Sequence, residues 1–98
     1  MPIQSFKCAD TGRLFGGERV RKFVAVESAA MRKLAMLNRA GRLDDLRVPP
    51  GNRLEALKGG RAGRHSIRIN DQFRVCFEWT RNGPANVEIV DDHGRRTP

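Results

Sequence analysis

Two runs of alternating apolar and polar residues constrain the fold more than any other feature of this sequence. Residues 65–70 place Ile67 and Ile69 on one face, and Ser66 and Arg68 on the other. Residues 73–79 repeat the alternation, with four apolar side chains on one face: Phe73, Val75, Phe77 and Trp79. A period of two over this length predicts two half-buried β-strands.

The short segment between the runs, residues 70–72, fixes how the strands can pair. In a hairpin with this three-residue loop, Ile69 lies opposite Phe73 and Ile67 lies opposite Val75. A two-residue loop would break this match. Because one face must be buried, we predict the register of the three-residue loop.

The predicted register also sets Arg68 directly opposite Arg74. Like charges in this position are destabilising by a fraction of about 1 kcal/mol. Two interpretations stay open from the pattern alone. The side chains splay apart into water, or they bind an anion such as a phosphate.

A helix and further short elements are expected around this hairpin. Residues 27–39 carry Ala30, Leu34 and Leu37 on one stripe, which predicts an amphipathic helix packed on the sheet. Strands are expected at residues 3–6 and 87–90, and a turn of helix at 43–46.

Two segments remain ambiguous from their residues. The glycines between Asp10 and Phe23 weaken a helix there, so a short helix or a turn is expected. Residues 54–57 are good helix formers, but they precede Gly59-Gly60, so a strand is equally consistent.

Size and charge limit the class of protein. The 98 residues suit one domain, 1–98, with a short polar tail at 94–98. The net charge of +8 favours a polyanionic partner, although a basic protein without such a role stays possible. No apolar run is long enough to span a bilayer and none resembles a signal peptide, so a cytoplasmic protein is expected. Cys8 and Cys76 do not form a metal-binding motif, and no motif predicts a cofactor.

The remaining polar residues suit metal-free phosphodiester chemistry. Ribonucleolytic cleavage can use the 2′-hydroxyl of the substrate, with one group as base and another as acid. Cationic side chains stabilise the charge that builds on the phosphate, and histidine is the first candidate for proton transfer. Candidates are the glycine-rich basic loop 58–64, the acidic pair Asp91 and Asp92, and His93. Each is also compatible with a solvated loop, a strand end or an ordinary chain end.

Together these residues resemble the HigB-type toxins of the RelE/ParE superfamily, found in type II toxin–antitoxin systems. The resemblance rests mainly on the C-terminal half of the chain, at residues 53–54, 57–59, 61, 63, 66–69, 72–77, 87–91 and 93. It implies a small RelE-like α+β fold, with helices packed on a mostly antiparallel sheet of about four to five strands.

The resemblance also implies a function and a set of site residues. It implies a ribosome-dependent, metal-independent endoribonuclease that cleaves messenger RNA and arrests growth. It implies a helix-turn-helix antitoxin of the HigA type as partner, with promoter DNA bound only through the complex. By position, the catalytic residues are Arg68, Arg74, Asp91 and His93. The residues expected to bind RNA phosphates are Lys58, Arg61 and Arg64.

Two departures from the family pattern keep other functions open. Asp92 stands where the family often has tyrosine, and Glu55 stands where some members carry a histidine. Glu55 could act as a base, or both changes could weaken cleavage. The alternatives are a ParE-like non-enzymatic inhibitor of a protein target such as gyrase, and a catalytically weakened basic RNA-binding module.

Overall fold

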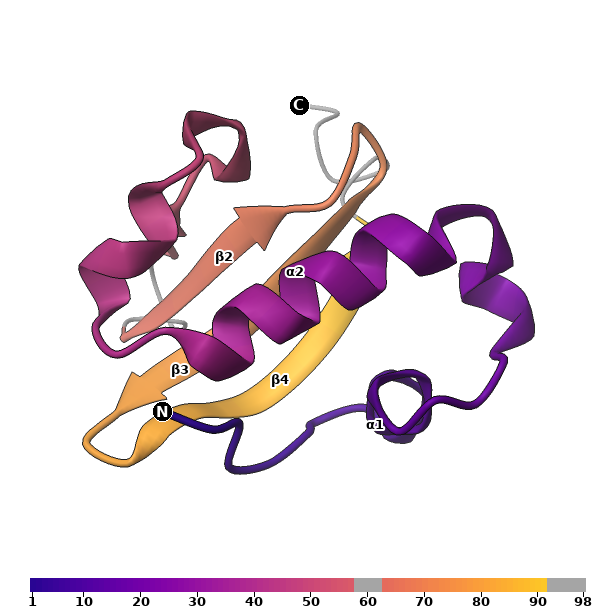
Figure 1. Cartoon of the computed structure of the whole chain (residues 1–98), viewed down its shortest axis with the longest axis horizontal. Helices are drawn as coiled ribbons and strands as arrows, with labels where there is room; N and C mark the ends of the chain where they lie inside the picture. Colours follow the sequence, from indigo (N-terminus) through magenta and orange to yellow (C-terminus); the bar gives the residue numbers. More distant parts are fainter. Residues whose placement is uncertain (58–62, 92–98) are drawn as a thin grey trace.

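One sheet and one long helix form the frame of the molecule. The computed structural model describes residues 1–57 and 63–91. The strands lie in sequence order and pair antiparallel: β1 (Glu55–Ala56), β2 (Arg64–Arg68), β3 (Phe73–Thr80) and β4 (Gly83–Asp91). Helix α2 (Glu27–Arg39) packs across one face of this sheet (Figure 1). The predicted α+β architecture is confirmed.

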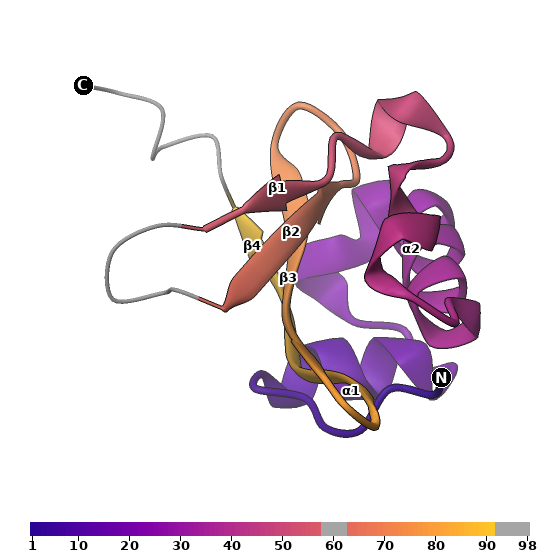
Figure 2. The ribbon, with the colours of Figure 1, turned by 90° about the vertical axis from the view of Figure 1, so that its left-hand side faces the viewer.

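The remaining helices are short and surround α2. Helix α1 (Ala9–Phe15) lies beside β4, and α2 packs on the sheet to one side (Figure 2). Three 3-10 helices connect the main elements: η1 (Arg21–Val26), η2 (Leu43–Arg47) and η3 (Pro50–Asn52). No helix within the described residues is long and apolar enough to cross a membrane.

The hairpin of β2 and β3 has the predicted register. Ile67 pairs with Val75, and Arg68 pairs with Arg74. The amide of Ile69 donates to the carbonyl of Phe73 at 2.9 Å. The turn is closed by the Asn70 side chain, whose Oδ1 accepts from the amides of residues 72 and 73 at 2.9 and 2.7 Å. An Asx turn of this kind explains why a three-residue loop holds here.

The hydrophobic core lies between α2 and the sheet. Ala30, Leu34 and Leu37 form the buried stripe of the helix, as their spacing predicted. They pack in one cluster with side chains from three strands: Ile67, Val75, Phe77, Val87 and Ile89. Burial of a large apolar side chain stabilises the fold by about 1.5–3 kcal/mol, so this layer is the main source of stability.

The ambiguous segment after residue 8 is a helix, despite its internal glycine. Gly12 packs closely on Phe6, because a Cβ there would lie 3.3 Å from the ring. The neighbouring Thr11 is fully buried, and its hydroxyl accepts from the amide of Ile89 at 3.0 Å. A contact with β4 therefore stabilises a helix that its own composition leaves weak.

The two predicted outer strands differ from expectation in length. The N-terminal segment forms only a parallel bridge, in which Phe6 pairs with Val87 beside β4. Strand β4 begins at Gly83, four residues before the predicted start. Its pairing with β3 continues across a β-bulge near Asn86, whose φ is 51°. The segment at 54–57 contains the short strand β1, so its strand interpretation is confirmed.

Candidate functional site

The face of the sheet opposite α2 carries polar side chains from adjacent strands. Glu55 pairs with Ser66, Ser66 with Cys76, and Cys76 with Glu88, so these four residues form one row across the sheet. Arg68 and Arg74 form the next row. Residues directly opposite each other in a sheet share a face. The hairpin therefore brings the two predicted catalytic arginines to the same side as Glu55.

Arg74 is held in place by several neighbours, although it carries a charge. Its side chain is only 8% exposed. Its Nε donates to Ser66 Oγ at 2.8 Å, and its Nη2 donates to the Arg53 carbonyl at 2.7 Å. Glu55 Oε2 lies 3.6 Å from the same Nη2. A buried guanidinium requires such partners, because an unpaired buried charge costs several kcal/mol.

Arg68 has a different environment from its neighbour. Its guanidinium pairs with Asp71 in the β2–β3 turn, and its side chain is 29% exposed. The Asp71 side chain is 91% exposed. The two guanidinium groups therefore reach in different directions, with Arg74 toward β1 and Arg68 toward the turn. Each of them is paired with a carboxylate.

Arg64 lies at the opposite end of β2, about 13 Å from Arg68 along the strand. Its Nη2 lies 3.2 Å from the Asn86 carbonyl and 3.4 Å from Glu88 Oε2. Lys7 Nζ lies 3.6 Å from the same Glu88 oxygen. Arg64 thus contributes to a structural ion pair at the bulge of β4, and its side chain is 13% exposed.

Asp91 lies at the last position of β4, at the same end of the sheet as Arg68. It pairs with Phe73, so the alternation of the strand directs it toward the α2 side, away from the face of Arg74. Gln72 Nε2 donates to Asp91 Oδ2 at 3.1 Å. The structure thus separates Asp91 and the arginines by face while keeping them at one end of the sheet. Lys58, Arg61, Asp92 and His93 lie outside the described residues.

Lys33 is a cation near this end of the sheet that sequence reasoning left as a solvated side chain. Its Nζ donates to Asn52 Oδ1 at 2.5 Å. Burial lowers the pKa of Lys33 below its ordinary value, and the nearby charges of Arg32 and Arg68 lower it further. Arg68 is the smallest of these three causes.

Two residues that hold Arg74 were missed by sequence reasoning. No role in the site was predicted for Ser66 from the sequence, and its side chain is buried with the hydroxyl oxygen accepting from Arg74 Nε. The alternation placed Ser66 and Arg68 on one face, which was the available signal. The hydrogen bond from Arg74 to the Arg53 carbonyl could not be predicted from the sequence, because it depends on the left-handed backbone of Arg53, with a φ of 46°. His65 pairs with Phe77 across the hairpin, and the two rings stack with their centroids 6.2 Å apart.

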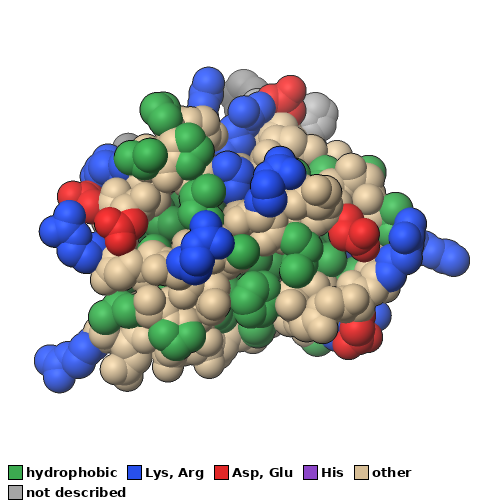
Figure 3. Space-filling view, in the orientation of Figure 1, with side chains coloured by type: hydrophobic (Ala, Val, Ile, Leu, Met, Phe, Trp, Pro, Cys, Tyr) green, Lys and Arg blue, Asp and Glu red, His purple; other side chains and the backbone are tan. Residues whose placement is uncertain are grey.

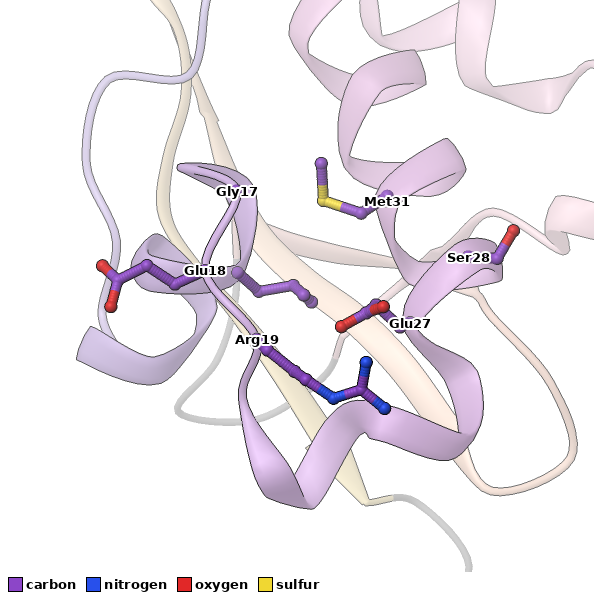
Figure 4. A pocket seen from close by; sticks show the side chains of 7 residues that line it. Gly17, Glu18, Arg19, Glu27, Ser28 and Met31 are labelled. Carbon is purple, nitrogen blue, oxygen red and sulfur yellow. The ribbon is translucent and has the colours of Figure 1, made fainter.

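Other surface features do not coincide with these residues. A hollow of about 440 Å³ lies between the end of α1 and the start of α2, where Arg19 and Glu27 face one opening (Figure 4). None of the predicted site residues that the structure describes lines it. On the α2 side of the molecule, lysine and arginine side chains are spread over the surface instead of gathering in one patch (Figure 3). The arginine face of the sheet is therefore the better candidate site.

Comparison with known proteins agrees with the resemblance. The family model described as the RelE-like toxin of the type II toxin–antitoxin system HigB matches residues 5–93. Toxin HigB-1 of Vibrio cholerae is 45% identical over 69 residues, which cover 70% of this chain and 72% of that protein. An uncharacterized protein of Haemophilus influenzae is 37% identical over 62 residues, which cover 63% of this chain and 60% of its own length. The stretch matched by the family model includes every predicted site residue.

Proposed function

From the fact that the chain belongs to the HigB-like family of RelE-like toxins of type II toxin–antitoxin systems, we propose that it is a metal-independent endoribonuclease. It cleaves messenger RNA on the ribosome, in the cytoplasm, and so arrests growth. The observation that carries the proposal is the pair of guanidinium-bearing residues, Arg68 and Arg74, set opposite each other in the sheet. Arginine is suited to this role because its planar group binds phosphate oxygens at two points.

The chemistry follows from the substrate. The ribose 2′-oxygen attacks the neighbouring phosphorus, and the bond from phosphorus to the 5′-oxygen breaks. The 2′-hydroxyl proton passes to a base, and the leaving 5′-oxygen receives a proton from an acid. Extra negative charge on the phosphate in the transition state is stabilised by Arg68 and Arg74.

The other predicted residues complete this scheme. His93 handles protons together with Asp91, since imidazole titrates near neutral pH. Lys58, Arg61 and Arg64 position RNA through its phosphates. Glu55 is a second candidate base, because its carboxylate lies 3.6 Å from Arg74 Nη2 at the edge of the site.

As a toxin of a type II system, the protein has an antitoxin partner. We propose that this antitoxin is a helix-turn-helix protein of the HigA type. In this proposal the toxin contacts promoter DNA only through the complex. The net charge of +8 supports rapid association with an acidic partner or with RNA. Coexpression with the candidate antitoxin should restore growth and yield a complex that copurifies.

The experiment that tests the enzyme is the mapping of RNA ends after induction. We expect new 5′ ends within translated messages, and we expect cleavage by purified protein only when ribosomes translate the message. His93→Ala should abolish the ends and relieve growth arrest while the protein stays folded. Undiminished toxicity from folded His93→Ala would falsify the assigned role of His93.

A second function is favoured by one observation. Both arginines are paired with carboxylates of the chain itself, Arg68 with Asp71 and Arg74 with Glu55. Such pairing reduces the positive charge offered to a phosphate, as in a protein that binds RNA without cleaving it. This alternative predicts RNA binding that weakens steeply with salt, and no new RNA ends. DNA-damage signalling without RNA cleavage would instead support a ParE-like inhibitor of a protein target.

A further inference from the structure

The contacts of Arg74 hold its guanidinium group through Nε and Nη2. Arginine has five N–H donors, one on Nε and two on each terminal nitrogen. In the parts of the chain that the structure describes, every acceptor bonds Nε or Nη2: Ser66 Oγ, the Ser66 carbonyl and the Arg53 carbonyl. These contacts fix the orientation of the Arg74 guanidinium through two of its three nitrogens.

Ser66 has the geometry to fix this arrangement. Its hydroxyl oxygen accepts from Nε at 2.8 Å, and its carbonyl lies 3.4 Å from Nη2. Ser66 is 1% exposed, so water cannot easily replace the hydroxyl. It lies on β2 in the row adjacent to that of Arg74, within the rigid part of the sheet.

The Arg53 carbonyl holds the Arg74 guanidinium group from the other side. It accepts from Nη2 at 2.7 Å, and Arg53 has a φ of 46°, a region that side-chain-bearing residues rarely adopt. Its neighbour Asn52 is fully buried and bonds both Leu46 and Lys33. This packing fixes the backbone that carries the carbonyl, which explains how an unfavourable conformation is maintained.

We propose that Ser66 is a positioning residue, which together with the Arg53 carbonyl locks the Arg74 side chain so that Nη1 faces the scissile phosphate. The inference rests on the proposed ribonuclease function. Preorganised donors stabilise transition-state charge because they need no reorientation during the reaction. Without the Ser66 hydroxyl, Arg74 keeps its charge and loses its orientation.

The test compares three substitutions of Ser66 in the full chain. Ser66→Ala removes the hydroxyl. Ser66→Thr and Ser66→Val enlarge the side chain to a similar volume, but only Ser66→Thr keeps a hydroxyl. We measure kcat and KM for cleavage of a defined message on purified translating ribosomes, with thermal melting as a check of folding. Ser28→Ala is the matched control, because Ser28 Oγ also bonds an arginine, Arg32, but on the exposed surface of α2.

We expect kcat to fall about tenfold or more in Ser66→Ala and Ser66→Val, with KM changed less than about twofold. Ser66→Thr should stay within about threefold of the unmodified protein. Equal activity of Ser66→Thr and Ser66→Val, or unchanged kcat in Ser66→Ala, overturns the positioning role. If Ser66→Ala does not fold, the Thr and Val pair still isolates the hydroxyl.

A second measurement separates this inference from the proposed function. In NMR spectra of the ¹⁵N-labelled protein, the Arg74 Nε–H should exchange slowly with solvent, and it should exchange much faster in Ser66→Val than in Ser66→Thr. Rapid exchange in the unmodified protein overturns the positioning role. If the unmodified protein cleaves no message on ribosomes, the proposed function is overturned, and the role of Ser66 in cleavage is overturned with it. This holds even if slow exchange shows that the Arg74 side chain is held in place.

Discussion

The two faces of the sheet bury their side chains by different means. On the α2 side, Phe77 and Val75 are fully buried in an apolar cluster. On the opposite side, Ser66 and Arg74 are nearly as buried, but hydrogen bonds and an ion pair satisfy them. Apolar contacts tolerate similar shapes, whereas a hydrogen-bonded guanidinium requires particular acceptors. The comparison indicates that the first face mainly provides stability and the second mainly provides a site.

The largest effect on stability is expected on the apolar face. Phe77→Ala leaves a cavity in the core and should lower the free energy of unfolding by about 3–5 kcal/mol. Since small domains are stable by about 5–15 kcal/mol, this loss is a large fraction of the total stability. Urea denaturation followed by circular dichroism measures the change. Val24→Ala, at a position that is 38% exposed, is the control and should change stability by less than about 0.5 kcal/mol.

On the polar face, Arg74→Lys should lower both activity and stability. Lysine keeps the charge and cannot reach both Ser66 Oγ and the Arg53 carbonyl in the planar arrangement of arginine. We expect a loss of about 2 kcal/mol in unfolding free energy and of about 10²-fold or more in kcat. Arg81→Lys, in the exposed β3–β4 turn, is the control. If Arg74→Lys cleaved at the normal rate, the functional contrast between the two faces would be lost.

Arg68 lies on the same face and should be almost neutral for stability. Its ion pair with the 91%-exposed Asp71 is of the kind that contributes about 0–1 kcal/mol. Arg68→Ala should therefore melt within a few degrees of the unmodified protein, and its kcat should fall about tenfold or more if Arg68 contacts the phosphate. Normal cleavage by Arg68→Ala would assign the phosphate contact to Arg74 alone.

Asp71→Asn tests whether the paired carboxylate competes with RNA. Removing its charge releases Arg68 and lowers local negative charge, so RNA affinity should rise about two- to fivefold at low salt. The gain should shrink as salt increases. Fluorescence anisotropy with a short RNA measures the affinity, and Glu18→Gln, whose carboxylate pairs with Arg13 near the end of α1, is the charge-matched control.

The sequence predicted the parts of the fold that periodicity controls. Helix 27–39 and the pairing of Arg68 with Arg74 followed from residue spacing and the length of one loop. The extension of β4 did not, because it depends on a bulge with a positive φ at Asn86. Helix α1 was ambiguous because its stability depends on Phe6 and Ile89, contacts that are distant in sequence.

For the candidate site, the sequence predicted which residues share a face but not what each one contacts. Alternation cannot show that Arg74 reaches back to Ser66 while Arg68 reaches forward to Asp71. Side-chain direction depends on the twist of the sheet and on the acceptors within reach. Nor could alternation show the backbone conformation at Arg53 that presents its carbonyl. The roles of the site residues themselves stay predictions.

The smallest expected effect tests the electrostatic link between the two faces at Lys33. Its pKa is lowered in the folded protein, first by burial and then by Arg32 and Arg68. Just below the ordinary lysine pKa, the unfolded chain therefore binds more protons at this position than the folded protein does. Stability contributed by Lys33 should rise as pH increases toward the ordinary lysine pKa of 10.5. The measurement is the difference in unfolding free energy between the unmodified protein and Lys33→Met across this range. Arg68→Ala should make the rise shallower, because it removes one of the charges that lower the pKa. A difference that falls with pH would contradict the lowered pKa of Lys33, and a difference that Arg68→Ala leaves unchanged would mean that Arg68 does not act on Lys33.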